Sequence, residues 1–166
     1  MTDLALPDKI TGIAPLREDY DVLLCDVWGV IHNGVKLFDG VNNALSQWRN
    51  SGGSVVLLTN APRPATTVQK RLDALNLDRE CYDDILSSGD AARDMLAQRA
   101  LQNQRCHFVG ADKDTDLIKD IPITLTDVED ADFVLFTGMA NDEVVTPEDY
   151  LPAITAWENE KLPLIC

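Results

Sequence analysis

The residue in this chain best suited to catalysis is Asp26, a lone carboxylate at the end of an apolar run. Val22–Cys25 precede it, and Gly29 follows three residues later. A buried parallel strand delivers an acid to its carboxyl end in this way, and open α/β sheets bind ligands at that edge. Asp26 is therefore a candidate nucleophile or metal ligand, although an isolated Asp at such a place more often only shapes a turn.

A hydroxyl and an amide, Thr59 and Asn60, close the second apolar run, residues 54–59. Roughly thirty residues separate Asp26 from Thr59, which is the length of a βαβ unit. The right-handed crossover of such a unit makes its two strands parallel, so all three polar groups should share one sheet edge. Hydroxyl and amide groups there can hold phosphate oxygens while the carboxylate attacks phosphorus. The Pro-rich segment 61–64 keeps open the alternative that Thr59 and Asn60 only form a turn.

The elements that must position these residues follow from apolar periodicity and capping signals. Residues 1–20 are expected to form an arm with one short helix, and the first strand covers 22–26. Ser88 is the expected N-cap of one helix, and Tyr150, Leu151, Ile154 and Trp157 are the expected apolar face of another. The remaining expected elements are helices near 41–48, 65–75 and 112–119 and strands at 54–59, 84–87, 106–110, 123–125, 133–136 and 162–166.

Composition narrows the class of protein. The 166 residues carry a formal net charge of −14, with 28 acidic against 14 basic residues. Such a surface repels nucleic acids and anionic membranes, so neither is an expected partner. No apolar stretch approaches the ~18 residues of a membrane span, and no signal peptide is visible. The four cysteines are scattered without a C-x-x-C pair, which disfavours disulfides and structural zinc and fits a reducing cytoplasm.

The segments Leu24–Gly34 and Leu57–Asn60 resemble the haloacid dehalogenase superfamily, and most closely its subfamily IIA of NagD-like phosphatases. Gly40, the pair Ser87-Ser88 and the strand–Gly pairs Val109-Gly110 and Thr137-Gly138 also fit that branch. The resemblance runs from Tyr20 onward. It implies an α/β fold: a Rossmann-like three-layer parallel sheet, here an incomplete core over 21–88, followed by a partial α/β C2-type cap over 89–166.

The resemblance also implies a mechanism and a site. Asp26 matches the nucleophile that forms an aspartyl-phosphate, and Asp26 with the backbone carbonyl of Trp28 would hold Mg²⁺. Trp28, Gly29, Thr59 and Asn60 match the loop and motif that bind the phosphate of a small phosphorylated metabolite. The family's usual pattern has a second Asp two residues after the nucleophile, as general acid and base, where this chain has Trp28. Losing a positioned general acid costs ~10²–10⁴-fold in rate, least for good leaving groups.

Alternatives remain beside the hydrolase. A non-catalytic phosphate-ligand binder or interaction domain would keep the fold without acid–base chemistry, and Trp28 motivates it. A receiver-type domain is disfavoured because Asp19 and Asp21 precede the strand. The third and fourth motifs of the family are not found in 1–166. We therefore expect a fragment cut within the cap, with little activity alone and with exposed sheet or cap surfaces that favour homo-oligomers.

Three further polar features are interpreted as structural. Arg63, in the Pro-flanked segment, could reach a substrate anion, but we expect it to face solvent. His32 is expected to hydrogen-bond within its own loop rather than touch a leaving group. The acidic stretch 127–132 is expected to be a solvated turn and not a metal site.

Overall fold

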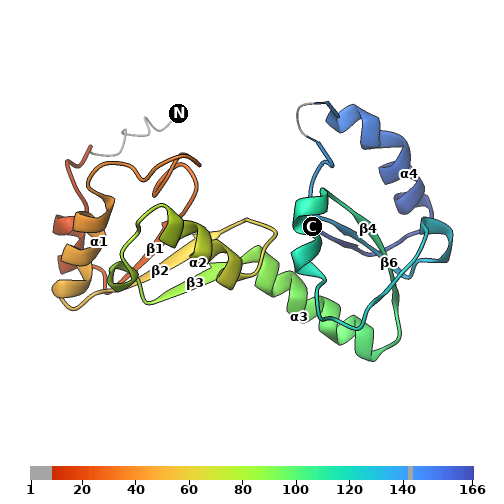
Figure 1. The fold of residues 1–166 in the computed structure, drawn as a ribbon, viewed down its shortest axis with the longest axis horizontal. Helices are drawn as coiled ribbons and strands as arrows, with labels where there is room; N and C mark the ends of the chain where they lie inside the picture. The colour runs from red at the N-terminus through yellow and green to blue at the C-terminus, as the bar shows by residue number, and fades with distance from the viewer. Residues whose placement is uncertain (1–8, 142–143) are drawn as a thin grey trace, which may run out of the picture. The chain divides into compact units, whose positions relative to one another are not determined.

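The computed structural model describes residues 9–141 and 144–166 (Figure 1). The expected arm over 1–20 therefore falls partly outside the described residues. Two compact units emerge: the first holds the chain up to Thr59 together with Gln69–Leu86, and the second holds Asn60–Val68 and Ser87–Cys166. Each unit contains one β-sheet with its own helices, so the expected α/β class with parallel sheets and a Rossmann-like core is confirmed.

The first sheet has the strand order β1-β2-β3. Strands β1 and β2 are parallel, and their register pairs Val22 with Ser54 and Asp26 with Leu58. Since this order advances in one direction and such crossovers are right-handed, α1 and α2 cover the same face of the sheet. The elements are η1 (Ala14–Glu18), β1 (Val22–Asp26), α1 (Val41–Asn50), β2 (Ser54–Thr59), α2 (Ala65–Ala74), η2 (Arg79–Cys81) and β3 (Asp84–Ser87).

Helix α1 is fixed to the sheet by its apolar stripe. Leu45 and Trp48, one turn apart, are both buried, and the indole N–H of Trp48 donates to the carbonyl of Ser54 at 3.1 Å. A Cβ on Gly53 would lie 2.4 Å from that indole nitrogen, so only glycine fits under the ring. This contact holds the start of β2, and the strand then carries Thr59 to the far edge of the sheet.

The other face of the first sheet is exposed and apolar. Val22, Leu24, Leu58 and Leu86 are all about half exposed; they alternate with half-buried residues on β1 and mainly with buried residues on β2 and β3. Strand β1 is also an edge of this sheet, and a hollow of about 410 Å³ beside it is lined mostly by apolar side chains such as Leu24, Val30 and Leu45. Exposed apolar patches and open edges of this kind mark association surfaces.

We expect this face to drive self-association of the chain. The double variant Leu24→Thr/Leu58→Thr should have a lower apparent mass at high protein concentration than the wild type, because threonine suits a strand but buries less apolar surface. Size-exclusion chromatography with light scattering over a range of concentrations measures this. Leu101→Thr is the control, since Leu101 is 86% exposed on α3. A wild type that is monomeric at every concentration would contradict the expectation.

The second sheet has the strand order β5-β4-β6-β7, and every pair in it is parallel. Strands β4 and β6 pair from Cys106 with Phe133 to Val109 with Phe136. The elements of this unit are α3 (Ser88–Leu101), β4 (Arg105–Val109), η3 (Asp112–Leu117), β5 (Thr124–Leu125), η4 (Val128–Asp130), β6 (Phe133–Phe136), η5 (Pro147–Tyr150), α4 (Leu151–Asn159) and β7 (Leu164–Ile165).

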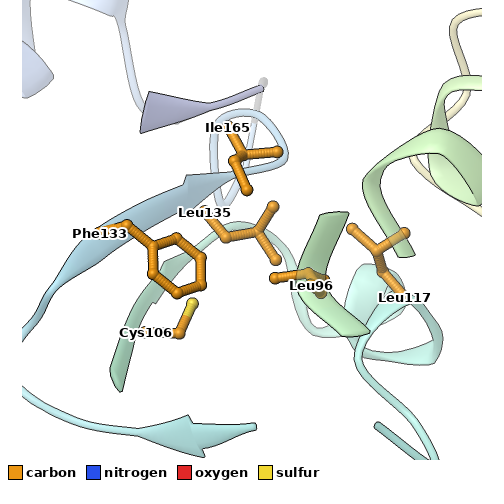
Figure 2. Close-up of a cluster of buried hydrophobic side chains, with 6 residues drawn as sticks. All are labelled: Leu96, Cys106, Leu117, Phe133, Leu135 and Ile165. Atoms are coloured by element: carbon orange, nitrogen blue, oxygen red, sulfur yellow. The ribbon is translucent and has the colours of Figure 1, made fainter. Parts of the chain in front are cut away.

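The core of the second unit lies between α3 and the middle of this sheet. Figure 2 shows its buried side chains converging from α3, η3 and the strands. On α4, Trp157 packs against Phe136 with ring centroids 6.1 Å apart, and the ring of Tyr150 lies 5.4 Å from that of Phe136. The buried cluster in Figure 2, between α3 and the sheet, comprises Leu96, Cys106, Leu117, Phe133, Leu135 and Ile165.

Several expected details differ from the structure. The N-cap of α3 is Ser87 rather than Ser88, and its hydroxyl accepts from the amide of Asp90 at 3.0 Å. The segment expected to be a helix over 112–119 is a 3-10 helix that ends at Leu117. Of the expected apolar face of α4, Trp157 is buried, whereas Leu151 and Ile154 are exposed. The acidic stretch 127–132 is solvated as expected, since Asp127, Glu129 and Asp130 are exposed, but it contains the 3-10 helix η4. Asp130 and Asp132 pair with Arg105.

Candidate functional site

Asp26 is the last residue of β1 and is exposed at the carboxyl end of the first sheet. Its Oδ1 accepts the N–H of Val27 at 2.8 Å, which fixes the orientation of the carboxylate. In the described part of the chain, no hydrogen bond or ion pair uses Oδ2. One oxygen is therefore tied to the backbone, and the other is open to a metal ion or to phosphorus.

The neighbouring thiol does not compete with this carboxylate. Burial, and next the charge of Asp26, raise the pKa of Cys25 above its ordinary value. A thiol that stays protonated is a poor nucleophile. Asp26 therefore remains the candidate nucleophile at the end of β1.

Thr59 and Asn60 lie at the same edge of the sheet as Asp26. The register places Leu58 beside Asp26, so Thr59 is one residue further along the neighbouring strand. Thr59 is buried at the end of β2, and Asn60 follows it and is exposed. The sequence prediction that the two strand ends meet is confirmed, whereas the roles of these side chains in binding phosphate stay predictions.

The loop after Asp26 is closed by its own hydrogen bonds. The N–H of Ile31 donates to Val27, and the N–H of Gly29 donates to the carbonyl of His32 at 2.8 Å. Gly29 has a φ of +82°, a conformation that side chains rarely adopt. The amide of Gly29 is thus used inside the loop in this conformation, so a bound phosphate would have to replace that bond.

Trp28 is 65% exposed, and its indole is not part of the core. The indole nitrogen lies 3.6 Å from the position that a Cβ on Gly34 would occupy, so the ring lies close to the later part of the loop. None of the described hydrogen bonds ends on the backbone carbonyl of Trp28. That carbonyl is therefore available as an oxygen ligand, while the side chain has no group that exchanges a proton near neutral pH.

His32 is buried and acts within the loop, as expected from the sequence. Its Nδ1 accepts the N–H of Gly34 at 2.9 Å, which leaves the proton of the neutral ring on Nε2. Burial, and next the charge of Arg71, lower the pKa of His32. A neutral ring whose Nδ1 is occupied is a weak proton donor at pH 7, so His32 does not replace the missing acid.

The oxygen donors at this edge fit a hard divalent cation, but only in part. Mg²⁺ prefers oxygen ligands and keeps several waters, and the carboxylate of Asp26 and the carbonyl of Trp28 offer two such ligands. Within residues 9–141 and 144–166, no group of three acidic, His or Cys side chains could hold a metal ion. The described residues thus offer two candidate ligands at this edge, which is fewer than a closed metal site needs.

The sequence analysis did not single out Asp114, whose side chain is buried and near Arg63 in the second unit. A signal was present, because Asp114 falls between Ala111 and Leu117 at spacings of three, and all three residues are buried. An acid at an apolar position of a periodic pattern is unusual. The expectation that Arg63 faces solvent holds only in part: its side chain is 36% exposed, but its guanidinium also lies 3.5 Å from that carboxylate.

A parallel α/β fold with an acid at the end of its first strand is the arrangement of a known enzyme class. The chain belongs to the haloacid dehalogenase-like hydrolases, whose family model matches residues 23–124. No curated protein gives a match to the chain. No helix in the described residues is long and apolar enough to cross a membrane.

Solved structures of this class superpose on most of the chain. A haloacid dehalogenase-like hydrolase from Brucella suis 1330 is 33% identical with a TM-score of 0.84, covering 96% of this chain and 59% of its own. NagD from E. coli K-12 is 24% identical with a TM-score of 0.52, and the match covers 70% of this chain and 45% of NagD. The magnesium complex of glycerol phosphate phosphatase from Mycobacterium tuberculosis is 23% identical with a TM-score of 0.59. The match covers 87% of this chain and 43% of the phosphatase.

The last two structures are similar in fold alone at these identities. The chain spans about half the length of these solved relatives.

Proposed function

We propose that this chain carries the nucleophile part of a Mg²⁺-dependent phosphatase of subfamily IIA, acting on a small phosphorylated metabolite. One observation carries the proposal: Asp26 ends β1 directly beside Leu58, the residue before Thr59 and Asn60. Membership of the haloacid dehalogenase-like hydrolases and the phosphatases among the similar structures support it. They favour a hydrolase over the alternative of a non-catalytic binder.

In the first step, Oδ2 of Asp26 forms a bond to phosphorus while the bond from phosphorus to the leaving oxygen breaks. The leaving oxygen takes the electron pair, and an aspartyl-phosphate is formed. Oδ1 stays on the N–H of Val27 at 2.8 Å, which keeps Oδ2 pointed outward during the attack. Water then attacks phosphorus, releases phosphate and restores the carboxylate.

Thr59 and Asn60 would hold the oxygens of the transferred group. A hydroxyl and an amide placed in advance lower the barrier because they need no reorganisation as charge develops. The backbone of β2 fixes Thr59 one residue beyond the register partner of Asp26. The amide of Gly29 would join them after leaving the carbonyl of His32.

Oδ1 of Asp26, which has a second lone pair beside the one that accepts from Val27, and the carbonyl of Trp28 would hold Mg²⁺, with water completing the shell. When bound, the ion neutralises negative charge on the phosphoryl group. The complex of the Mycobacterium tuberculosis phosphatase with magnesium supports a divalent cation of this kind. Two protein ligands alone bind such an ion weakly, so we expect this chain to need a high concentration of Mg²⁺.

The substrates should be those with good leaving groups. Neither the indole of Trp28 nor the neutral ring of His32 donates a proton at pH 7, so the leaving oxygen must depart unprotonated. Acyl and aryl phosphates meet this condition, because their leaving groups are stable as anions. Alkyl phosphates such as sugar phosphates do not, so turnover of them by this chain should be slow.

The change of unit between Leu86 and Ser87 supports a division into a core over 21–88 and a partial C2-type cap over 89–166, although Asn60–Val68 belong to the second unit. The arm over 1–20 stays a prediction. The acidic surface and the scattered free cysteines support a cytoplasmic protein without nucleic acid or membrane partners. Homo-oligomers would form through the exposed face of the first sheet.

Phosphorylation of Asp26 tests the proposal directly. Incubation of the full chain with acetyl phosphate and Mg²⁺ should add one phosphoryl group, seen by intact-protein mass spectrometry and mapped to Asp26 by peptide analysis. The acyl phosphate has a good leaving group, so the missing general acid has little effect. Removing Mg²⁺ with a chelator should abolish the product.

Asp26→Asn is the decisive variant, because asparagine keeps the size of the side chain and its acceptor for Val27 but is not a nucleophile. It should show no added phosphoryl group. Asp39→Asn is a matched control on an exposed acid of the same unit and should label like the wild type. Equal labelling of the wild type and Asp26→Asn would refute Asp26 as the nucleophile.

A further inference from the structure

The second sheet has a topological switch point between β4 and β6. Strand β4 comes first in the chain, and its successors β5 and β6 lie on opposite sides of it in the order β5-β4-β6-β7. Open parallel sheets bind ligands outside the carboxyl ends of the strands at such a point. Here those ends carry Gly110 after β4 and Thr137-Gly138 after β6.

The backbone approaches closely at this point. A Cβ on Gly110 would lie 1.9 Å from the hydroxyl oxygen of Thr137, so only glycine fits there. Among the described residues, no backbone carbonyl accepts a hydrogen bond from the amide of Gly110 or Gly138. Two strand ends are thus held together with amide groups that point to no protein acceptor.

Asp114 lies beside these strand ends, and its side chain is only 6% exposed. Its Oδ1 is buried and accepts no hydrogen bond in the described structure. Its Oδ2 receives only a long contact from the hydroxyl of Thr137 at 3.5 Å. Burying a carboxylate is strongly unfavourable unless a partner compensates its charge, so Asp114 requires a cation or a donor close by.

The cation is Arg63, whose backbone is fixed within the same unit. The carbonyl of Ala61 accepts from the N–H of Gly89 at 3.2 Å and from the hydroxyl of Ser88 at 3.1 Å. A Cβ on Gly89 would come within 2.4 Å of the Arg63 backbone, so the first turn of α3 packs directly on this segment. Arg63 is therefore held at its backbone by α3.

The guanidinium of Arg63 is directed by the carboxylate. Its Nε lies 3.5 Å from Oδ1 of Asp114, and its side chain remains 36% exposed. Neither Nη group makes a hydrogen bond within the described residues. A guanidinium that faces a carboxylate through Nε still presents both Nη groups, which match two oxygens of a carboxylate or phosphate.

We propose that Arg63, positioned by Asp114, binds an oxyanion of a small-molecule ligand at the switch point of the second sheet. The occupant is a carboxylate or phosphate group, bound by both Nη groups of Arg63 and by the amides of Gly110 and Gly138. Asp114 is a positioning residue: it orients Nε and does not touch the ligand. This site lies in the second unit and does not depend on chemistry at Asp26.

A purely structural ion pair would also explain why Asp114 is buried, and it makes a different prediction. It would leave the amides of Gly110 and Gly138 insensitive to added anions. It would also give Arg63→Lys little effect, because lysine keeps the charge. The fork of the guanidinium matters only if two oxygens are bound at once.

The test is to add an oxyanion stepwise to the full ¹⁵N-labelled chain and to measure the backbone amide NMR signals of Gly110 and Gly138 at each step. Inorganic phosphate is one probe, malonate is the other, and sodium chloride at equal ionic strength corrects for screening. Saturable shifts with phosphate, malonate or both support the site and identify which oxyanion it takes. Arg63→Lys and Asp114→Asn should each weaken binding about tenfold or more. The first loses the fork that binds two oxygens at once, and the second loses the charge that orients the guanidinium.

Two matched variants make the result specific. Arg105→Gln removes another partly exposed arginine of the same unit, which pairs with Asp130 and Asp132, and should bind like the wild type. Asp26→Asn should also bind normally, so failure of the phosphatase proposal leaves this one standing. Shifts no larger than those with chloride would overturn the proposal, as would unchanged binding in both Arg63→Lys and Asp114→Asn.

Discussion

Replacing Trp28 with aspartate is expected to speed the hydrolysis of an alkyl phosphate by ~10²–10⁴-fold, the usual contribution of a positioned proton donor. The carboxyl group would protonate the leaving oxygen in the first step and take a proton from the attacking water in the second. The side chain of Trp28 is 65% exposed, so the replacement removes little buried surface and should not disturb the fold. The prediction assumes that Asp26 is the nucleophile.

The measurement compares phosphate release from glycerol phosphate and from p-nitrophenyl phosphate, with Mg²⁺ present. The aryl phosphate should gain much less, because its leaving group needs no proton. Trp28→Asn is the control, since asparagine has the same size and cannot donate a proton from a carboxyl group. Asp26→Asn/Trp28→Asp should show only background rates. If Trp28→Asp and Trp28→Asn hydrolyse glycerol phosphate equally, position 28 is not where the general acid belongs.

Local patterns were sufficient to predict the placement of Asp26 and Thr59. An apolar run ending in Asp26, a helix and a second run ending in Thr59 fix a parallel pair of strands, because the crossover has one hand. The observed register puts Leu58 beside Asp26, as that argument requires. The inward hydrogen bond of His32 was also predictable, since a His between two glycine turns has backbone amides within reach.

The pairing of Arg63 with Asp114 could not be predicted from local pattern. The two residues lie far apart in the chain, and only the packing of α3 and the second sheet brings them together. Similarly, the apolar spacing on α4 does not say how much of that face is covered. Trp157 reaches the aromatic rings of Phe136 and His107, while Leu151 and Ile154 remain exposed. Periodicity specifies a face of a helix, but not what lies opposite it.

The N-cap of α3 shows how two adjacent candidates are decided by backbone geometry. Both Ser87 and Ser88 have a suitable hydroxyl, but Ser87 is extended, with φ −114° and ψ 147°, and its hydroxyl accepts from Asp90. Ser88 instead uses its hydroxyl on the carbonyl of Ala61. The second hydroxyl is thus recruited by a segment distant in sequence, which a local capping rule does not consider.

Phe133→Ala is expected to destabilise the second unit by about 3–5 kcal/mol, the usual cost of emptying a buried aromatic site. Phe133 is fully buried and belongs to the cluster in Figure 2, where its ring lies beside Cys106. The guanidinium of Arg99 also lies 4.5 Å from its ring centroid, a cation–π contact that the variant removes. Since domains are stable by only ~5–15 kcal/mol, this loss should leave the unit partly unfolded at moderate urea.

Two tryptophans allow each unit to be followed separately in a urea titration. The indole N–H signal of Trp157 reports the second unit, and that of Trp48, bonded to Ser54, reports the first. Phe133→Ala should lower the midpoint for Trp157 far more than the midpoint for Trp48. Leu101→Ala, at an 86% exposed site on α3, should change the unfolding free energy of neither unit by more than ~0.5 kcal/mol. Equal, small shifts in both variants would mean that the cluster around Phe133 does not hold β4 and β6 together. The switch point between β4 and β6 would then lack the rigid support that oxyanion binding requires.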